Sequence, residues 1–154
     1  MAFDKKQLKL VIYNTLIKYS AIEPRIYSKI AYKLVCGTIA RESLWGTYLY
    51  QDSKRFTYET HGLGIGQCEM PTFDWLKGLY GKKFGFSESV YMDLITDLDL
   101  AILICRLRYF ANSKPLPRDD HPLILGKYWD EVYNGNPRYG TPEEFVETYN
   151  KYVK

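Results

Sequence analysis

Apolar residues recur at every third or fourth position over most of this chain, and this spacing limits the possible folds more than any other feature. Side chains three and four positions apart share one face of an α-helix, whereas the side chains of a strand alternate between two faces. The apolar run Leu100–Leu107 predicts the central core helix. The predicted helices cover residues 4–20, 25–43, 72–80, 87–95, 97–112, 123–133 and 142–152.

Two segments interrupt the helical spacing. Residues 45–60 predict turns and a short irregular segment or β-hairpin. Three glycines among residues 62–66 exclude a stable helix until Pro71 or Thr72, so this loop exposes its backbone. A chain of 154 residues encloses one core, and we therefore expect a mainly α-helical single domain over residues 1–154.

Aromatic residues are unusually frequent. They make up 16% of the chain, with 15 tyrosines, which is more than a core of this size needs. Some of them are therefore expected to line a groove, where aromatic rings pack on the C–H faces of sugars. Trp45, Tyr48 and Tyr50 follow the second predicted helix and are candidates for such a platform, whereas Trp75 and Trp129 are predicted to lie in the core.

The charge pattern does not favour a nucleic-acid-binding protein. The net charge is +3, and basic residues are scattered among acidic ones without forming a run. A basic helical nucleic-acid binder is an alternative that predicts salt-sensitive DNA affinity. We expect no nucleic-acid partner, and most charged side chains should be solvated surface groups.

The cysteines predict neither disulfides nor a metal site. Cys36, Cys68 and Cys105 are odd in number, lie in apolar stretches and show no CxxC or Cys/His metal-binding spacing. They are interpreted as buried, reduced thiols. We therefore expect no metal and no cofactor.

The first 20 residues do not resemble a secretory signal. Their charged residues are interleaved with the apolar ones, and no small-residue cleavage site follows. No stretch is long and apolar enough to predict membrane insertion. The expectation is a protein made in a cytoplasm, which would need another route to reach a cell wall.

Glu42 is the candidate for chemistry. Counting back four and seven positions reaches Thr38 and Val35, so the carboxyl projects from the buried face where the second helix ends. A carboxyl held against apolar groups loses hydration of its charged form, which raises its pKa and suits it to be a general acid. The competing interpretation is a solvated or helix-capping glutamate.

The glycine-rich loop follows Glu42 by about two dozen residues and carries Gln67. A backbone without side chains can approach a polysaccharide closely and offer N–H and C=O groups to its hydroxyls and acetamides. Gln67 adds an amide that can both donate and accept. Together the acid and the loop indicate cleavage of a glycosidic bond, whose leaving oxygen needs a proton.

Three segments resemble the motifs of lysozyme-like lytic transglycosylases of the soluble type. They are IARES at 39–43, GLGIGQCEMPTFDWL at 62–76 and YWDEVYN at 128–134, in the order and spacing of that family. Small bacteriophage-encoded members are more similar still, because RLRYFANSKPLPRDD and GTPEEFVETYNKY also match. The resemblance covers about residues 30–152 and leaves the N-terminal helix, residues 1–20, outside it.

The resemblance implies a role for each matching residue. Glu42 would be the acid/base that protonates the bond between N-acetylmuramic acid and N-acetylglucosamine, and then helps the muramic acid C6 hydroxyl close a 1,6-anhydro ring. Bacterial peptidoglycan would be the partner, together with other virion proteins if the enzyme is carried in a phage particle. The residues that match substrate-contacting positions of the family are Ser43, Gln67, Tyr133 and Asn134, with the Tyr133 hydroxyl near the catalytic carboxyl. Tyr48 of the aromatic platform and Gly64 and Glu69 of the glycine-rich loop are also expected to bind substrate.

Two other functions remain open at this point. A hydrolytic lysozyme would need a second carboxylate, for which Asp52, Glu59 and Glu69 are candidates. The first two are otherwise solvated turn charges, and Glu69 is otherwise a partner of Arg41 or of the N–H groups at a helix start. The other alternative is a non-catalytic glycan-binding or structural virion protein of the same fold.

Neither histidine is assigned to the reaction. His61 could act as a proton shuttle, but a lone histidine beside a glycine is also typical of a loop surface. His121 precedes a proline in a polar connector and is interpreted as structural or exposed.

Overall fold

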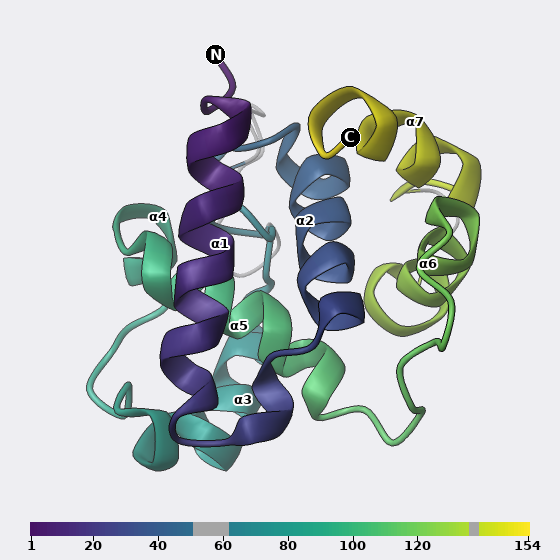
Figure 1. The fold of residues 1–154 in the computed structure, drawn as a ribbon. Coiled ribbons are helices and arrows are strands. Elements are labelled where there is room, and N and C mark those ends of the chain that lie inside the picture. Colours follow the sequence, from purple (N-terminus) through teal and green to yellow (C-terminus); the bar gives the residue numbers. More distant parts are fainter. Residues whose placement is uncertain (51–61, 136–138) are drawn as a thin grey trace.

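The computed structural model describes residues 1–50, 62–135 and 139–154, and it is mainly helical as predicted (Figure 1). Within these ranges the only β-type pairings are isolated bridges, which join Leu63 to Tyr50 and to Cys68. The elements are α1 (Lys5–Ser20), η1 (Pro24–Ile26), α2 (Lys29–Ser43), α3 (Met70–Phe84), α4 (Asp93–Thr96), α5 (Leu98–Phe110), α6 (Pro122–Trp129), η2 (Asp130–Asn134) and α7 (Pro142–Tyr152). Residues 51–61, most of the segment predicted to be irregular or a hairpin, lie outside the described residues.

Helix α5 is the central core helix, as the run Leu100–Leu107 predicted. Every residue of that run is buried, and α5 packs against α1, α2 and α3. Asp97 caps the helix by accepting a hydrogen bond from the backbone N–H of Leu100 at 3.0 Å. The surrounding helices therefore share one apolar centre.

Helix α1 begins as predicted at its cap, because Asp4 accepts a hydrogen bond from the N–H of Gln7 at 2.9 Å. Its buried face is narrow, and Val11 next to it is exposed. The face still reaches the core through Leu8, Ile12, Thr15 and Leu16. The helix that lies outside the resemblance is thus part of the same packing.

The predicted bounds of two helices were wrong. The second helix begins at Lys29 rather than residue 25, because Ser28 caps the N–H of Ala31 and the preceding residues form the separate turn η1. The third starts at Met70 and continues to Phe84, where Gly85 adopts a left-handed conformation and ends it.

The prediction of a helix over 87–95 was also wrong, since only residues 93–95, the first three of α4, are helical there. The backbone N–H groups of Ser89 and Asp93 bond carbonyls three residues earlier in separate turns, and the Asp93 carboxylate accepts the N–H of Val90. Side chain–backbone bonds of this kind compete with helix formation.

The helix predicted over 123–133 changes geometry along its length. It begins at Pro122 as α6 and widens into a π-helical turn, η2, which ends at the left-handed Gly135. Trp129 and Tyr133 lie at the two ends of this change, and both are buried. A π-turn inside a helix often marks a functional site, because it redirects side chains.

The three cysteines are free and buried, as predicted. Burial raises the pKa of the Cys36 and Cys68 thiols to about 12, so they remain protonated. Among the helices that the structure describes, none has the length and hydropathy needed to cross a membrane.

Candidate active site

The Glu42 carboxyl lies in the last turn of α2 and has two different oxygens. Oε1 accepts a hydrogen bond from the indole Nε1 of Trp129 at 3.0 Å. Oε2 has no hydrogen-bond partner among the described residues, and it is not one of their fully buried polar atoms. The side chain as a whole is partly exposed. One oxygen is therefore held by the protein, and the other is open to an approaching molecule.

Loss of hydration raises the pKa of Glu42 from 4.5 to about 7. The negative charge of Glu69 acts in the same direction. The Trp129 hydrogen bond and the positive charges of Arg41 and Arg108 lower this pKa, but they do not outweigh the loss of hydration. Glu42 can therefore hold a proton near neutral pH and also release it, as an acid/base group must.

Trp129 is the functional residue that sequence analysis missed. It was predicted to be a core residue, and it is indeed fully buried, with its ring 5.7 Å from that of Phe145. Its N–H nevertheless contacts the carboxyl 87 positions earlier in the chain. A buried tryptophan needs a partner for its N–H, and this requirement is the signal that could have directed attention to Glu42.

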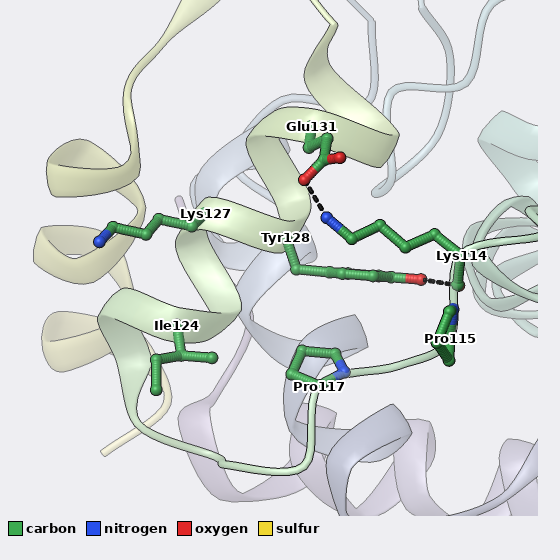
Figure 2. Close-up of a pocket in the computed structure, with 7 residues that line it drawn as sticks. All are labelled: Lys114, Pro115, Pro117, Ile124, Lys127, Tyr128 and Glu131. Atoms are coloured by element: carbon green, nitrogen blue, oxygen red, sulfur yellow. Dashed lines mark hydrogen bonds and ion pairs between the residues drawn. The ribbon is translucent and has the colours of Figure 1, made fainter.

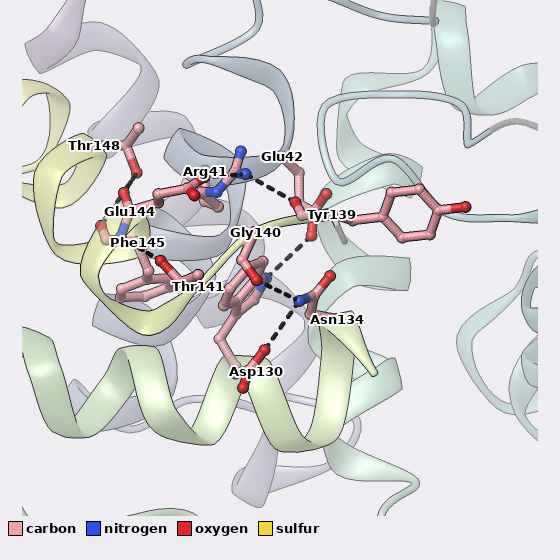
Figure 3. A network of polar contacts seen from close by, with 11 residues as sticks. Arg41, Glu42, Asp130, Asn134, Tyr139, Gly140, Thr141, Glu144, Phe145 and Thr148 are labelled. Carbon is pink, nitrogen blue, oxygen red and sulfur yellow. Dashed lines mark hydrogen bonds and ion pairs between the residues drawn. The ribbon is translucent and has the colours of Figure 1, made fainter. Parts of the chain in front are cut away.

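Arg41 joins the last turn of α2 to the start of α7 (Figure 3). Its Nη2 donates to the Tyr139 carbonyl and to the Glu144 carboxylate, each at 2.8 Å, and its guanidinium lies 5.7 Å from the centre of the Trp129 ring. Gly140 is required beside it, because a Cβ there would lie 2.4 Å from the same nitrogen. This packing fixes the wall of the site behind Trp129.

Asn134 belongs to the same wall. Its Nδ2 donates to the Asp130 carboxylate at 2.9 Å and to the Gly140 carbonyl at 3.2 Å (Figure 3). The amide predicted to bind substrate thus holds η2 against the segment that precedes α7. Its donor is already used within the protein.

The glycine-rich loop is a tight turn closed by two hydrogen bonds between Leu63 and Cys68, at 2.9 and 3.0 Å. Gly64 has φ +77 and no room for a Cβ, which would lie 2.6 Å from the Leu94 carbonyl. Its N–H donates to the Leu49 carbonyl. The prediction that this N–H is available to a substrate was therefore wrong. Gly64 shapes the loop instead.

Gln67 also adopts a left-handed conformation, with φ +50. Its amide nitrogen donates to the carbonyls of Gly64 at 2.9 Å and Tyr48 at 3.3 Å. The amide oxygen accepts no hydrogen bond from the described residues, and the side chain is partly exposed. The end of Gln67 that remains for a ligand is therefore an acceptor.

Tyr133 connects η2 to the glycine-rich loop. Its hydroxyl donates to the Gly66 carbonyl, and its ring lies 5.2 Å from that of Tyr109. The Tyr133 hydroxyl was predicted to lie near the acid. Burial is the main cause that raises the pKa of this phenol, and the negative charge of Glu42 also raises it, so the two groups interact electrostatically. No hydrogen bond joins the Tyr133 hydroxyl to Glu42 in the described structure.

Ser43 stabilises the chain reversal that follows α2. Its hydroxyl donates to the Ile39 carbonyl at 3.0 Å and accepts the N–H of Gly46 at 2.9 Å. Leu44 and Trp45 then adopt left-handed conformations. Ser43 therefore sets where the helix ends, and with it where the adjacent Glu42 lies.

The predicted aromatic platform was partly wrong. Tyr48 and Tyr50 are about half exposed, but Trp45 is fully buried, because the left-handed turn directs it onto Tyr152 of α7. Trp75 was also wrongly predicted as core: it is 51% exposed on the outer face of α3.

Of the proposed second carboxylates, only Glu69 lies within the described residues. It is exposed and precedes α3 without capping it. The proposed pairing with Arg41 was wrong, because Arg41 binds Glu144. Asp52, Glu59 and His61 lie outside the described residues, and His121 is an exposed cap that accepts the N–H of Leu123.

A mainly apolar hollow of about 230 Å³ lies elsewhere, between the proline-rich connector and α6 (Figure 2). Tyr128 crosses it and donates to the Lys114 carbonyl at 2.8 Å, and Lys114 pairs with Glu131 at its edge. Glu42 is not among its lining residues. Across the described ranges, no three histidine, cysteine or acidic side chains gather as a metal site would require.

Replacing Trp129 with phenylalanine is expected to raise the pKa of Glu42 further. The substitution removes the N–H that stabilises the carboxylate, and a hydrogen bond to a charged group is worth about 1.5 kcal/mol or more, which corresponds to about one pH unit. The carboxyl titration followed by ¹³C NMR measures this directly. Trp75→Phe, the same change at an exposed position, should leave the titration unaltered.

An unchanged Glu42 titration in Trp129→Phe would contradict the role given to the indole.

The candidate site is a partly exposed, desolvated acid held by Trp129, next to a tight loop and to the wall organised by Arg41. No family model, no curated protein and no solved structure matches this chain.

Proposed function

We propose that this protein cleaves the glycan strands of bacterial peptidoglycan as a lytic transglycosylase with a lysozyme-like fold, using Glu42 as its single acid/base. The observation that carries the proposal is the carboxyl itself. It has a pKa of about 7, one oxygen held by Trp129 and the other open. Cleavage of a glycosidic bond needs such a proton donor at neutral pH.

The hydrogen bond from Trp129 determines which oxygen carries the proton. Oε1 accepts the indole N–H, so the protonated carboxyl is best stabilised with its own hydrogen on Oε2. That oxygen is the accessible one. The proton of the acid therefore lies on the oxygen that has no partner among the described residues.

The reaction then follows in two steps. Oε2 gives its proton to the oxygen between N-acetylmuramic acid and N-acetylglucosamine, and that bond breaks as positive charge develops at C1. The resulting Glu42 carboxylate takes the proton of the muramic acid C6 hydroxyl while that oxygen bonds to C1. The products are a 1,6-anhydro end and a free 4-hydroxyl, and Glu42 is protonated again.

The arrangement of the three sequence motifs supports the lysozyme-like part of the proposal. Glu42 comes from the first motif and Trp129 from the third, and they share a hydrogen bond. Tyr133 of the third motif donates to Gly66 of the second. Segments far apart in the chain thus converge around one carboxyl, as an active site assembled from these motifs requires.

Hydrolysis with a second carboxylate is the alternative that one observation favours. Glu69 is exposed, does not cap α3 and carries a charge that acts on Glu42. A carboxylate in that position could activate water on the sugar. The product would then carry a reducing end instead of an anhydro end.

Mass spectrometry of fragments released from purified peptidoglycan tests the proposal. We expect muropeptides with 1,6-anhydro ends, which are lighter by one water than the hydrolytic products. Reducing ends would instead indicate hydrolysis, and Glu69→Gln would then identify the second carboxylate by its loss of activity. If no glycan bond is cleaved, the protein is a binding or structural component.

A further inference from the structure

Arg108, in the last turn of α5, has not been assigned a role so far. Its Nη2 donates to the Tyr133 carbonyl, and its guanidinium lies 4.4 Å from the centre of the Tyr133 ring. It is partly buried and has no carboxylate partner among the described residues. A cation half removed from water without a counter-ion is costly, and this suggests that an anion binds there when the protein functions.

The remaining donors of Arg108 are free. Nε and Nη1 make no hydrogen bond within the described structure, and neither is fully buried, in contrast to Arg41 Nε and Arg106 Nη1. A guanidinium binds a carboxylate best through two parallel N–H groups. Nη2 also has a second N–H that Tyr133 does not use, and this N–H is parallel to one of Nε or of Nη1, so Arg108 keeps one pair of donors for such a contact.

The guanidinium is near enough to the carboxyl of Glu42 for its charge to act on it. Tyr133, which it contacts on one side, is bonded to Gly66 of the glycine-rich loop, and the positive charge of Arg108 lowers the pKa of Glu42. Arg41 is the other cation that acts on Glu42, but it already pairs with Glu144 at 2.8 Å. Among the described residues, Arg108 is therefore the cation acting on Glu42 that keeps free donors.

A free cation at this position conflicts with cleavage of a neutral glycan. Positive charge develops on the sugar as the glycosidic bond breaks, and a neighbouring guanidinium would oppose it. The conflict disappears if the substrate itself brings a negative charge that pairs with the guanidinium. Muramic acid strands do so, through the lactyl carboxyl or through the carboxylates of the attached peptide, whereas polymers of N-acetylglucosamine alone do not.

We infer that Arg108 binds a carboxylate of the substrate and makes the site selective for acidic glycan strands over neutral ones. The inference rests on the proposed function, since it concerns the same site. It assigns Arg108 to substrate recognition and leaves proton transfer to Glu42. The carboxylate would come from the lactyl group or from the peptide.

Binding measurements separate these possibilities. The Glu42→Gln protein, which should bind without cleaving, is titrated with three kinds of soluble glycan strand. The first carries its intact peptides, and the second has had its peptides removed, so that its lactyl carboxylates are free. The third is the second strand with every carboxylate converted to a neutral methylamide. We expect at least one acidic strand to bind about tenfold or more tightly than the neutral strand. The acidic strand that shows the preference identifies the source of the carboxylate.

Adding Arg108→Gln to the Glu42→Gln protein should reduce the ratio of its affinities for the acidic and neutral strands to about one. Its affinity for the neutral strand should stay within about twofold of that of Glu42→Gln alone. Arg108→Lys should keep part of the preference, because it retains the charge but loses the paired donors. Arg118→Gln, at an exposed position of the connector, removes the same charge and should keep the full preference. An equal loss of affinity for all three strands in Arg108→Gln would show a structural role and overturn the inference.

The same experiment overturns the inference if the Glu42→Gln protein shows no preference for acidic strands or binds none of the strands. It does not depend on turnover. A preference that requires Arg108 in a protein that cleaves no glycan bond would refute the proposed function and support the recognition role. Cleavage to anhydro products without any charge preference would do the reverse.

Discussion

Glu42→Gln is expected to lower the release of glycan fragments from purified cell walls by about a thousandfold or more. A general acid contributes about 10²- to 10⁴-fold to such reactions, and here one carboxyl serves both steps. Glutamine keeps the acceptor for Trp129, so the geometry should be retained while the proton is lost. The measurement is the initial rate of fragment release, normalised to folded protein.

Two variants serve as comparisons for that experiment. Glu88→Gln changes an exposed glutamate and should clear walls like the parent protein. Glu42→Asp keeps the acid but withdraws it by one methylene from Trp129 and from the bond to be protonated, so activity should be low but detectable. Wall clearing by Glu42→Gln at the parent rate would remove Glu42 from the mechanism.

Stability should also depend on Glu42, in the direction opposite to activity. The folded state raises the pKa of this carboxyl from 4.5 to about 7, so the folded protein binds the proton more tightly than the unfolded chain. Its contribution to stability is complete below pH 4.5 and is lost as the pH rises to about 7. The loss is about 1 to 3 kcal/mol, because the open Oε2 retains part of its hydration.

The neutral Glu42→Gln variant should escape this loss. Its free energy of unfolding, from urea titrations, is expected to match that of the parent near pH 4 and to exceed it by about 1 to 3 kcal/mol at pH 8. Glu23, whose pKa is lowered to about 2 by its bonds to Arg25, titrates in both proteins and cancels in the difference. A difference that does not change with pH would mean that Glu42 is hydrated like a surface glutamate.

These two results together would identify a group kept for function at a cost in stability. If the carboxylate served only as a structural partner, neutralising it would lower the stability of the folded protein. A desolvated acid shows the reverse, because its charged form is the poorly accommodated one. The pair of measurements therefore distinguishes a catalytic from a structural glutamate even before the product is known.

Much of the helical structure followed from local sequence signals. Helix starts with a capping aspartate or threonine, as at Asp4, Asp97 and Thr141, lie within a residue or two of their predicted positions, because a cap acts over three residues. The core run of α5 was confirmed for a similarly local reason, the continuous apolar character of residues 100–105. The prediction over 87–95 failed where turn-forming side chains competed with the helix.

The candidate site was predictable only in part. The position of Glu42 on the buried stripe of α2 indicated an acid with a raised pKa, in agreement with its desolvated environment. The sequence identified the loop residues but not the contacts that they make. Gly64 and Gln67 donate their hydrogen bonds to carbonyls of neighbouring residues. Which polar groups stay free depends on the folded backbone around them.

By itself, the sequence determined the mainly helical structure, the central helix α5 and the position of the Glu42 carboxyl on the apolar stripe of α2, because these depend on spacing within about ten residues. The tertiary structure alone decided which groups meet that carboxyl. Trp129 reaches it across 87 positions of chain, and Arg41 reaches Tyr139 and Glu144 across 98 and 103. Contacts at such separations arise from the packing of whole helices, and they determine how much water, and which charges, surround Glu42.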